Sequence, residues 1–376
     1  QRPLVPEAFP LDAAVRSALD VEWLTDEERA ALRTFHGQWT HEDLAEPRRA
    51  AFVAAERLDA DDPALADPSV SPAVRAEVLM RVGRVEAARD LLADLESPGA
   101  AELRLHAEAL ALLGRHDAAL DVLDRMAGLV LEAMEAERPA DLVAIARGRM
   151  LAGTIEGAPA GTWRDVVSLL SRVHQQLDRL HWPALVAEGD LLAAKHRTMA
   201  AVEAYHAALA LNPRSAEAWY GLGRLALRRF DFGGAARAAT NLMSLRPGHP
   251  WAQLLLAETR LIQDDPDGAA EILDRTLAAH PGQREAMALR TAAAAMRYDE
   301  AELAGALAAW DAVAPGAPHA RTQAGRYLSL FRQYDDARPM LRAAIDQLPG
   351  WSEPRLLLGL MEMQAGRDDL AAAVLR

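Results

Sequence analysis

The sequence predicts an all-α protein, a solenoid of antiparallel helix hairpins. The first observation is a proline at a fixed interval of 34 residues: Pro213, Pro247, Pro281, Pro315 and Pro349. The second is a column of mostly small residues twelve positions before each proline and once beyond the last: Ala201, Ala235, Ala269, Leu303, Ala337 and Ala371. Self-similarity at such a period is the signature of stacked repeats. We therefore expect hairpins that stack on their neighbours rather than one compact core.

The helix that faces this column carries small residues as well. Twelve positions earlier the chain has Gly189, Gly223, Ala257, Thr291, Gly325 and Gly359. Two helices can approach closely only where their facing side chains are small. The two columns together predict close helix pairs in most copies, and a looser pair where Thr291 and Leu303 replace the small residues.

The copy at residues 216–249 is the most regular. It carries Trp219, Leu222, Gly223, Ala226, Ala235, Ala239, Leu242 and Pro247. This pattern resembles the consensus of the tetratricopeptide repeat family, with Ala226 in place of the usual tyrosine. The resemblance is clear over residues 182–376, as five and a half copies, and degenerate over 71–181. It implies a right-handed superhelix with a concave face. The copy at 284–317 departs most, with Arg290, Thr291 and Leu303, so we expect its hairpin to be splayed or shifted.

Residues 1–70 do not follow the repeat and predict a separate helical segment. A short helix is expected at 12–20. Thr25, followed by three acidic residues, predicts a capped helix that ends near Gly37. A further helix begins near Thr40, with Pro47 in its first turns or at a kink. Residues 59–72 have the aspartates and prolines of a loop.

Residues 71–152 predict degenerate hairpins. The pairs are 74–82 with 85–95 and 101–113 with 117–126, and both turn at a Gly-Arg sequence, Gly83 and Gly114. Helices are also expected at 129–137, 139–151 and 163–180. The glycine- and proline-rich stretch at 153–161 predicts a break, so we assign 153–181 as a joint before the array at 182–376. The last repeat is cut off at Arg376, and the natural protein is expected to continue.

Composition narrows the function classes. The formal net charge is −14 with a pI near 5.3, which argues against nucleic acid and anionic membranes as partners. The chain has no cysteine, which excludes disulfides and cysteine-ligated metals, and no apolar run long enough to span a bilayer. The start at Gln1 and the missing cysteines favour a periplasmic or secreted location.

No sequence pattern predicts a catalytic or cofactor site. The zinc motif HExxH, the phosphate loop and the GxSxG turn are absent. Gly221 and Gly223 belong to a repeat helix rather than a nucleotide loop. His36, His41, Glu42 and Asp43 could surround a metal, but we interpret them as helix-end residues. We therefore expect no enzyme, no cofactor and no metal.

The resemblance places particular repeat positions on the concave face. The partner-binding residues that we expect there are Tyr220, Arg224, Arg228, Trp251, Leu254, Glu258, Leu261 and Arg326. Further positions of this face are Glu217, Leu227, Ile262, Ala292, Met296, Thr322, Leu356, Leu360 and Met363. The lysine and asparagine clamp that some family members use for a C-terminal carboxylate is absent. An equally open alternative is that Trp251, Leu254 and Leu261 only pack on the adjacent hairpin.

These residues predict a non-catalytic interaction module that binds a peptide or partner helix in the concave groove. The alternative is the recognition or scaffolding arm of a larger enzyme, for example a hydrolase, whose catalytic domain lies beyond residue 376. The sequence leaves the oligomeric state open.

Overall fold

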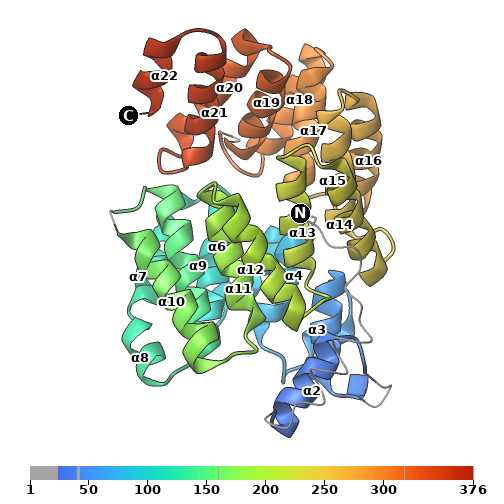
Figure 1. Cartoon of the computed structure of the whole chain (residues 1–376), viewed down its shortest axis with the longest axis vertical. Coiled ribbons are helices and arrows are strands. Elements are labelled where there is room, and N and C mark those ends of the chain that lie inside the picture. The colour runs from blue at the N-terminus through green and yellow to red at the C-terminus, as the bar shows by residue number, and fades with distance from the viewer. Residues whose placement is uncertain (1–23, 40–42, 160, 317, 376) are drawn as a thin grey trace.

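The computed structural model describes residues 24–39, 43–159, 161–316 and 318–375, and within these the chain forms helices and no strand. Figure 1 shows the helices stacked in sequence order as hairpins. The all-α solenoid predicted from the proline period is confirmed. The short helix expected at 12–20 lies outside the described residues.

The N-terminal segment contains two α-helices and two 3₁₀ turns. They are α2 (Asp26–Phe35), η1 (Asp43–Ala45), α3 (Pro47–Arg57) and η2 (Pro63–Ala66). Thr25 accepts a hydrogen bond from the Glu28 backbone N–H, and the Glu28 side chain accepts one from the Thr25 N–H. This reciprocal cap fixes the start of α2 where the sequence predicts it. Pro47 occupies the first turn of α3, where its missing N–H costs nothing.

The N-terminal segment docks on the repeats through Glu56 of α3. This side chain is buried, and its carboxyl oxygens accept hydrogen bonds from Asn212 Nδ2 at 3.1 Å and Ala216 N at 3.0 Å. Arg246 also donates to the backbone oxygen of Leu58 at 3.0 Å. The segment therefore covers the inter-repeat loops around residues 212 and 246.

The degenerate hairpins come next. They comprise α4 (Pro72–Arg81), α5 (Val85–Ala93), α6 (Ala100–Leu112), α7 (His116–Ala127), α8 (Val130–Glu135), α9 (Pro139–Ile155), α10 (Thr162–Arg172) and the π-helical turn η3 (Val173–Leu177). The expected break begins later than predicted, because Gly153 still lies inside α9. A side chain at Gly153 would collide with the indole ring of Trp163, so this glycine allows α10 to pack on α9. The proposed joint at 153–181 stays a prediction, and one apolar cluster joins Leu142, Leu170 and Leu191 across it.

The regular array follows as six helix pairs. They are α11 (Trp182–Ala194), α12 (Thr198–Leu211), α13 (Ala216–Leu227), α14 (Phe232–Leu245), α15 (Pro250–Ile262), α16 (Pro266–Ala279), α17 (Arg284–Met296), α18 (Glu300–Asp311), α19 (Pro318–Leu330), α20 (Tyr334–Gln347), α21 (Ser352–Gln364) and α22 (Asp368–Leu375). Asp231 and Asp265 cap α14 and α16 through the backbone N–H groups of Gly234 and Gly268. Trp219 donates its indole N–H to the carbonyl of Pro213 at 2.8 Å, which ties the repeat proline to the following helix.

Each hairpin of the array turns through one residue with a positive φ. These residues are His196, Phe230, Asp264, Tyr298, Arg332 and Gly366, and their φ values lie between 55° and 72°. Gly83 and Gly114 adopt the same backbone conformation in the degenerate hairpins. Non-glycine residues are strained here, so the strain must be offset by the packing of the two helices they connect.

The hairpin of the most degenerate copy is splayed, as the sequence predicts. α17 packs along α19 of the next repeat, whereas α18 touches α19 at only a few positions. Trp310 is the one buried residue of α18, and Gly305 has no neighbouring heavy atom within 4 Å of where a β-carbon would lie. The larger side chains at positions 291 and 303 therefore coincide with a displaced second helix.

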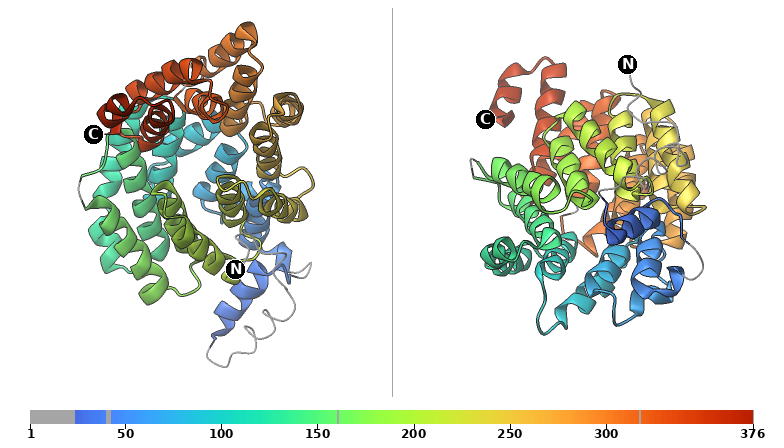
Figure 2. Two further views of the ribbon diagram at one scale, coloured as in Figure 1. Left: turned by 45° about the horizontal axis from the view of Figure 1, so that its top comes forward. Right: turned by 60° about the horizontal axis from the view of Figure 1, so that its bottom comes forward.

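The superhelix closes on itself. Figure 2 shows the helices winding around a central axis, so that the first hairpins lie beside the last repeats. Gly83, in the turn between α4 and α5, lies so close to Gly282 that neither could carry a side chain. Gly114 likewise approaches Pro315, and Gly157 approaches Gly350. Three turns of the N-terminal hairpins thus rest on three successive inter-repeat loops, and the concave face becomes an enclosed channel.

Candidate binding channel

Three connected cavities line the inner face of the superhelix. The N-terminal cavity has a volume of about 640 Å³, the central cavity about 400 Å³ and the C-terminal cavity about 750 Å³. The N-terminal and central cavities share the lining residues Arg81, Glu217 and Trp251. The central and C-terminal cavities share His196, Arg224, Arg228 and Glu353. Because each pair shares walls, the three cavities form one channel.

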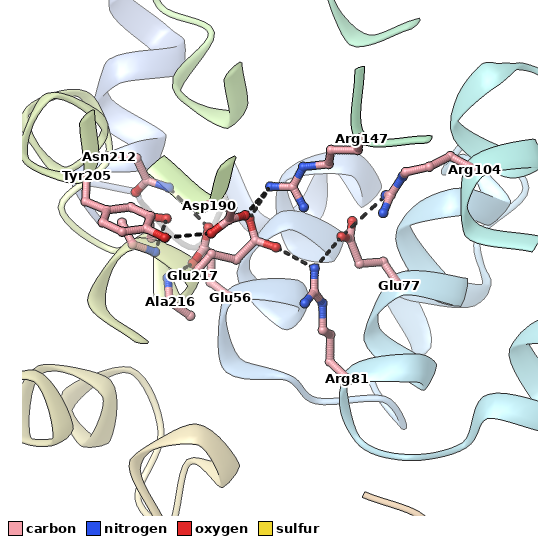
Figure 3. A network of polar contacts seen from close by, with 12 residues as sticks. Glu56, Glu77, Arg81, Arg104, Arg147, Asp190, Tyr205, Asn212, Ala216 and Glu217 are labelled. Carbon is pink, nitrogen blue, oxygen red and sulfur yellow. Dashed lines mark hydrogen bonds and ion pairs between the residues drawn. The ribbon is translucent and has the colours of Figure 1, made fainter. Parts of the chain in front are cut away.

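Ion pairs cross the channel between the N-terminal and central cavities (Figure 3). Glu217 of α13 pairs with Arg81 of α4 at 2.6 Å and with Arg147 of α9 at 3.2 Å. Arg81 also pairs with Glu77 at 3.1 Å, and Arg147 lies 3.6 Å from Asp190 of α11. The network therefore braces the degenerate hairpins against the regular array.

The pKa values in this network reflect burial and pairing. Burial alone would raise the pKa of Glu77, but the positive charges of Arg104, Arg81 and Arg147 lower it to about 2. Burial raises the pKa of Asp190, although Arg147 opposes the shift. For Arg81, burial lowers the pKa, and the carboxylates of Glu217 and Glu77 more than reverse that effect. Such paired charges are costly to separate inside a protein, so the network is a structural brace.

An aromatic stack lies beside this brace. The rings of Tyr220 and Trp251 are stacked, with centroids 5.1 Å apart. The Arg81 guanidinium lies 5.3 Å from the Trp251 ring, and the Arg224 guanidinium lies 5.8 Å from the Tyr220 ring. The Tyr220 hydroxyl is buried and has no hydrogen-bond partner in the described part of the chain. The stack thus forms a rigid wall with one unsatisfied polar group.

The C-terminal cavity combines an apolar wall with a charged floor. Its apolar lining is Leu227, Phe230, Ile262, Leu330, Leu356, Leu357, Leu360 and Met361. On the floor, Arg326 forms an ion pair with Glu353, and Arg228 lies 3.9 Å from the same carboxylate. Arg228 also donates to the Ala193 carbonyl at 3.2 Å. Phe230, Leu330 and Leu360 are large apolar side chains that remain 57%, 41% and 45% exposed.

Comparisons with known proteins identify the repeats. Residues 186–242 and 322–376 match one tetratricopeptide repeat family model, and residues 226–293 match another. The array from residue 186 to 376 belongs to the tetratricopeptide repeat family. The stretch left unmatched within it, 294–321, contains the splayed helix α18. Tetratricopeptide repeats typically form protein-interaction modules.

Similar solved structures support the fold. A chain of the crystal structure of the APC/C hetero-tetramer Cut9–Hcn1 is 14% identical with a TM-score of 0.52, and the match covers 94% of this chain and 67% of that chain. A tetratricopeptide repeat protein from Parabacteroides merdae is 15% identical with a TM-score of 0.46, covering 70% and 98%. YrrB, a tetratricopeptide repeat protein described as having an unusual peptide-binding site, is 19% identical with a TM-score of 0.30, covering 53% and 97%. Curated proteins gave no significant match.

The structure places the expected partner-binding residues in two groups. Five line the channel: Tyr220, Arg224, Arg228, Glu258 and Arg326. Trp251 lines it too, but is only 5% exposed. Leu254 and Leu261 are fully buried in the apolar cluster of the tetratricopeptide array and line none of the three cavities. Packing therefore accounts for these two leucines.

Some channel residues were not among those expected. Glu353 occupies the same repeat position as Glu217 and Trp251, and Leu330 the same position as Arg228 and Ile262. Extending the repeat rule to the last copies would have found both. Arg81 and Arg147 come from outside the regular copies, so the repeat pattern carries no signal for them.

The polar cluster proposed from sequence is only partly described, since His41 and Glu42 lie outside the described residues. His36 is buried at the end of α2, and burial lowers its pKa. Across the described ranges, no group of three or more His, Cys, Asp or Glu side chains could hold a metal ion. In the same ranges, no helix has the length and apolar character needed to cross a bilayer.

Proposed function

We propose that this chain is a non-catalytic interaction module that binds a peptide or a partner helix in the C-terminal cavity. The observation that carries the proposal is the exposed apolar wall of that cavity. Phe230, Leu330 and Leu360 come from three different repeats and converge on one cavity of about 750 Å³. Exposed apolar side chains that gather around a concave site are typical of protein-binding surfaces.

The other two cavities are weaker sites. A ligand in the central cavity would have to separate or bypass the ion pairs of Arg81 and Arg147 with Glu217. The apolar lining of the N-terminal cavity is mostly half-buried, including Phe52, Val74 and Trp182. The C-terminal cavity therefore offers the most apolar area that a partner could still cover. The net charge of −14 supports a protein partner over a nucleic acid.

A peptide selection tests this function. Random dodecapeptides displayed with both ends fused to a carrier protein would be panned against the full chain, and the affinity of enriched peptides would be measured by fluorescence anisotropy. Leu360→Arg places a charge in the apolar wall and should weaken binding at least tenfold, because interface anchors commonly contribute about 2 kcal/mol.

The matched control is Leu131→Arg on α8, which changes a leucine that is 73% exposed and lies outside the three cavities. This variant should bind like the wild type, and both variants should keep their far-ultraviolet circular dichroism. Failure to enrich any peptide would refute the proposal. Loss of binding with Leu131→Arg but not with Leu360→Arg would move the site to the outer surface.

A further inference from the structure

The junction of the central and C-terminal cavities contains a guanidinium without an ionic partner. Arg224 lines both cavities. In the described part of the chain no carboxylate lies within 4 Å of Arg224 to form an ion pair, and its one direct contact of this kind is the Tyr220 ring. Its neighbours Arg228 and Arg326 both use Glu353. Arg224 is thus the arginine of this cluster that is left without a direct anion.

The other nearby carboxyl groups do not fill this role. Glu285 and Glu258 are close enough to favour the charged form of Arg224 without pairing with it. Glu285 accepts a hydrogen bond from Gln323 at 3.3 Å. Glu258 is only 4% exposed, and burial raises its pKa, which favours its neutral form. Beside Arg224, the buried hydroxyl of Tyr220 is a second donor without a partner in the described residues.

The position of Arg224 indicates where an anion would sit in a bound ligand. One side of Arg224 opens to the central cavity, with its aromatic wall, and the other side opens to the apolar wall formed by Ile262, Leu356 and Leu360. Room on both sides suits a chain that continues in both directions from the anionic group. A terminal group would leave one of the two sides empty.

We infer that Arg224 selects peptides that carry an internal aspartate or glutamate next to apolar residues, and that it binds this carboxylate at the junction of the two cavities. The inference rests on the proposed function. Tyr220 is placed to donate a further hydrogen bond, and the apolar residues of the peptide cover Leu356 and Leu360. Arginine forms strong charge-assisted hydrogen bonds with carboxylates, so the contact contributes selectivity as well as affinity.

The test uses the same peptide library, whose members have no free carboxyl terminus. Peptides selected on the wild-type chain should be enriched in Asp or Glu flanked by apolar residues. Arg224→Gln should keep binding peptides through their apolar residues but lose the acidic preference. The matched control is Arg229→Gln, at the exposed end of the same helix and outside the cavities, which should select the same acidic motif as the wild type.

Synthetic versions of the best peptide separate the two sources of a carboxylate. Replacing the internal Glu by Gln should weaken binding to the wild type at least tenfold, and to Arg224→Gln by less than twofold. Amidating the C-terminus should change the affinity less than twofold. Binders without acidic preference, or a loss on amidation alone, would overturn the inference while leaving the proposed function intact. An empty selection would refute both.

Discussion

The repeats at residues 216–249 and 284–317 follow the same plan but pack differently. In the first, Gly223 lies against Ala238 and Leu255, where a β-carbon would be 3.1 Å from Ala238 Cβ. In the second, Thr291 stands at the position of Gly223 and is fully buried, with its hydroxyl donating to the Met287 carbonyl at 2.9 Å. There α18 is displaced, and α17 packs on α19 instead.

The difference shows what a repeat can lose. The helices and the turn survive, since the caps are present in both copies: Asp231 caps α14, and Asp299 caps α18 at 2.9 Å from Glu302 N. What changes is the close approach of the two helices, which depends on small side chains. Local signals thus set the helices, whereas side-chain volume sets how they pair.

The largest expected contrast between the two repeats depends on pH. Burial raises the pKa of Glu56, which caps the start of the regular repeat, from 4.5 to about 8. Between these two values the folded state binds the extra proton, so stability is full below pH 4.5 and falls as pH rises to 8, by about 1.4 kcal/mol per pKa unit. Glu56→Gln should remove this fall, so its melting temperature should gain on the wild type between pH 5 and pH 8.

Hydrogen exchange would locate this effect. Raising the pH should loosen α13 and α14 in the wild type more than in Glu56→Gln, and leave the difference at α18 unchanged. A melting-temperature difference that stays constant with pH would show that Glu56 is ionised in the folded protein.

Ala235→Leu should produce the next largest effect. Ala235 is 1% exposed in the regular repeat, and overpacking of such a site costs about 1 to 3 kcal/mol. Urea unfolding monitored by circular dichroism gives the measurement. An unchanged midpoint would mean that the two helices can separate as they do in the 284–317 copy.

One substitution should have opposite signs in the two repeats. Gly223→Ala should destabilise by about 1 kcal/mol, because the new methyl group meets Leu255 and Ala238. Gly305→Ala adds a methyl group to the exposed middle of α18, with nothing within 4 Å, and should stabilise by about 0.5 to 1 kcal/mol. Equal effects of both changes in urea unfolding would contradict the difference in packing.

Leu303→Ala should have the smallest effect. Leu303 is half-buried at the edge of the cluster formed by Ala295, Leu328 and Leu358, so we expect a loss of about 1 kcal/mol or less. A loss of 2 kcal/mol or more would indicate that this leucine holds α18 in place.

The repeat period made much of the fold predictable, because helix starts, turns and close contacts depend on residues near in sequence. Thr25, Asp231 and Asp265 cap helices as expected. The channel was less predictable. Leu254 and Leu261 occupy positions expected on the concave face, yet neighbouring hairpins cover them. Arg81 and Arg147 reach the channel only because the rotation of many repeats brings distant hairpins together, which no local pattern encodes.

The contact between Gly83 and Gly282 alters how this solenoid should fold. In an open array each unit touches only its neighbours, and the ends can fray independently. Here the first hairpins meet units that are distant in sequence, so the contact forms only after a long loop has closed, at an entropic cost that local pairing does not have. Such non-local contacts slow folding. They also couple the two ends, so that opening α4 and α5 should loosen α16 and α17 as one cooperative unit.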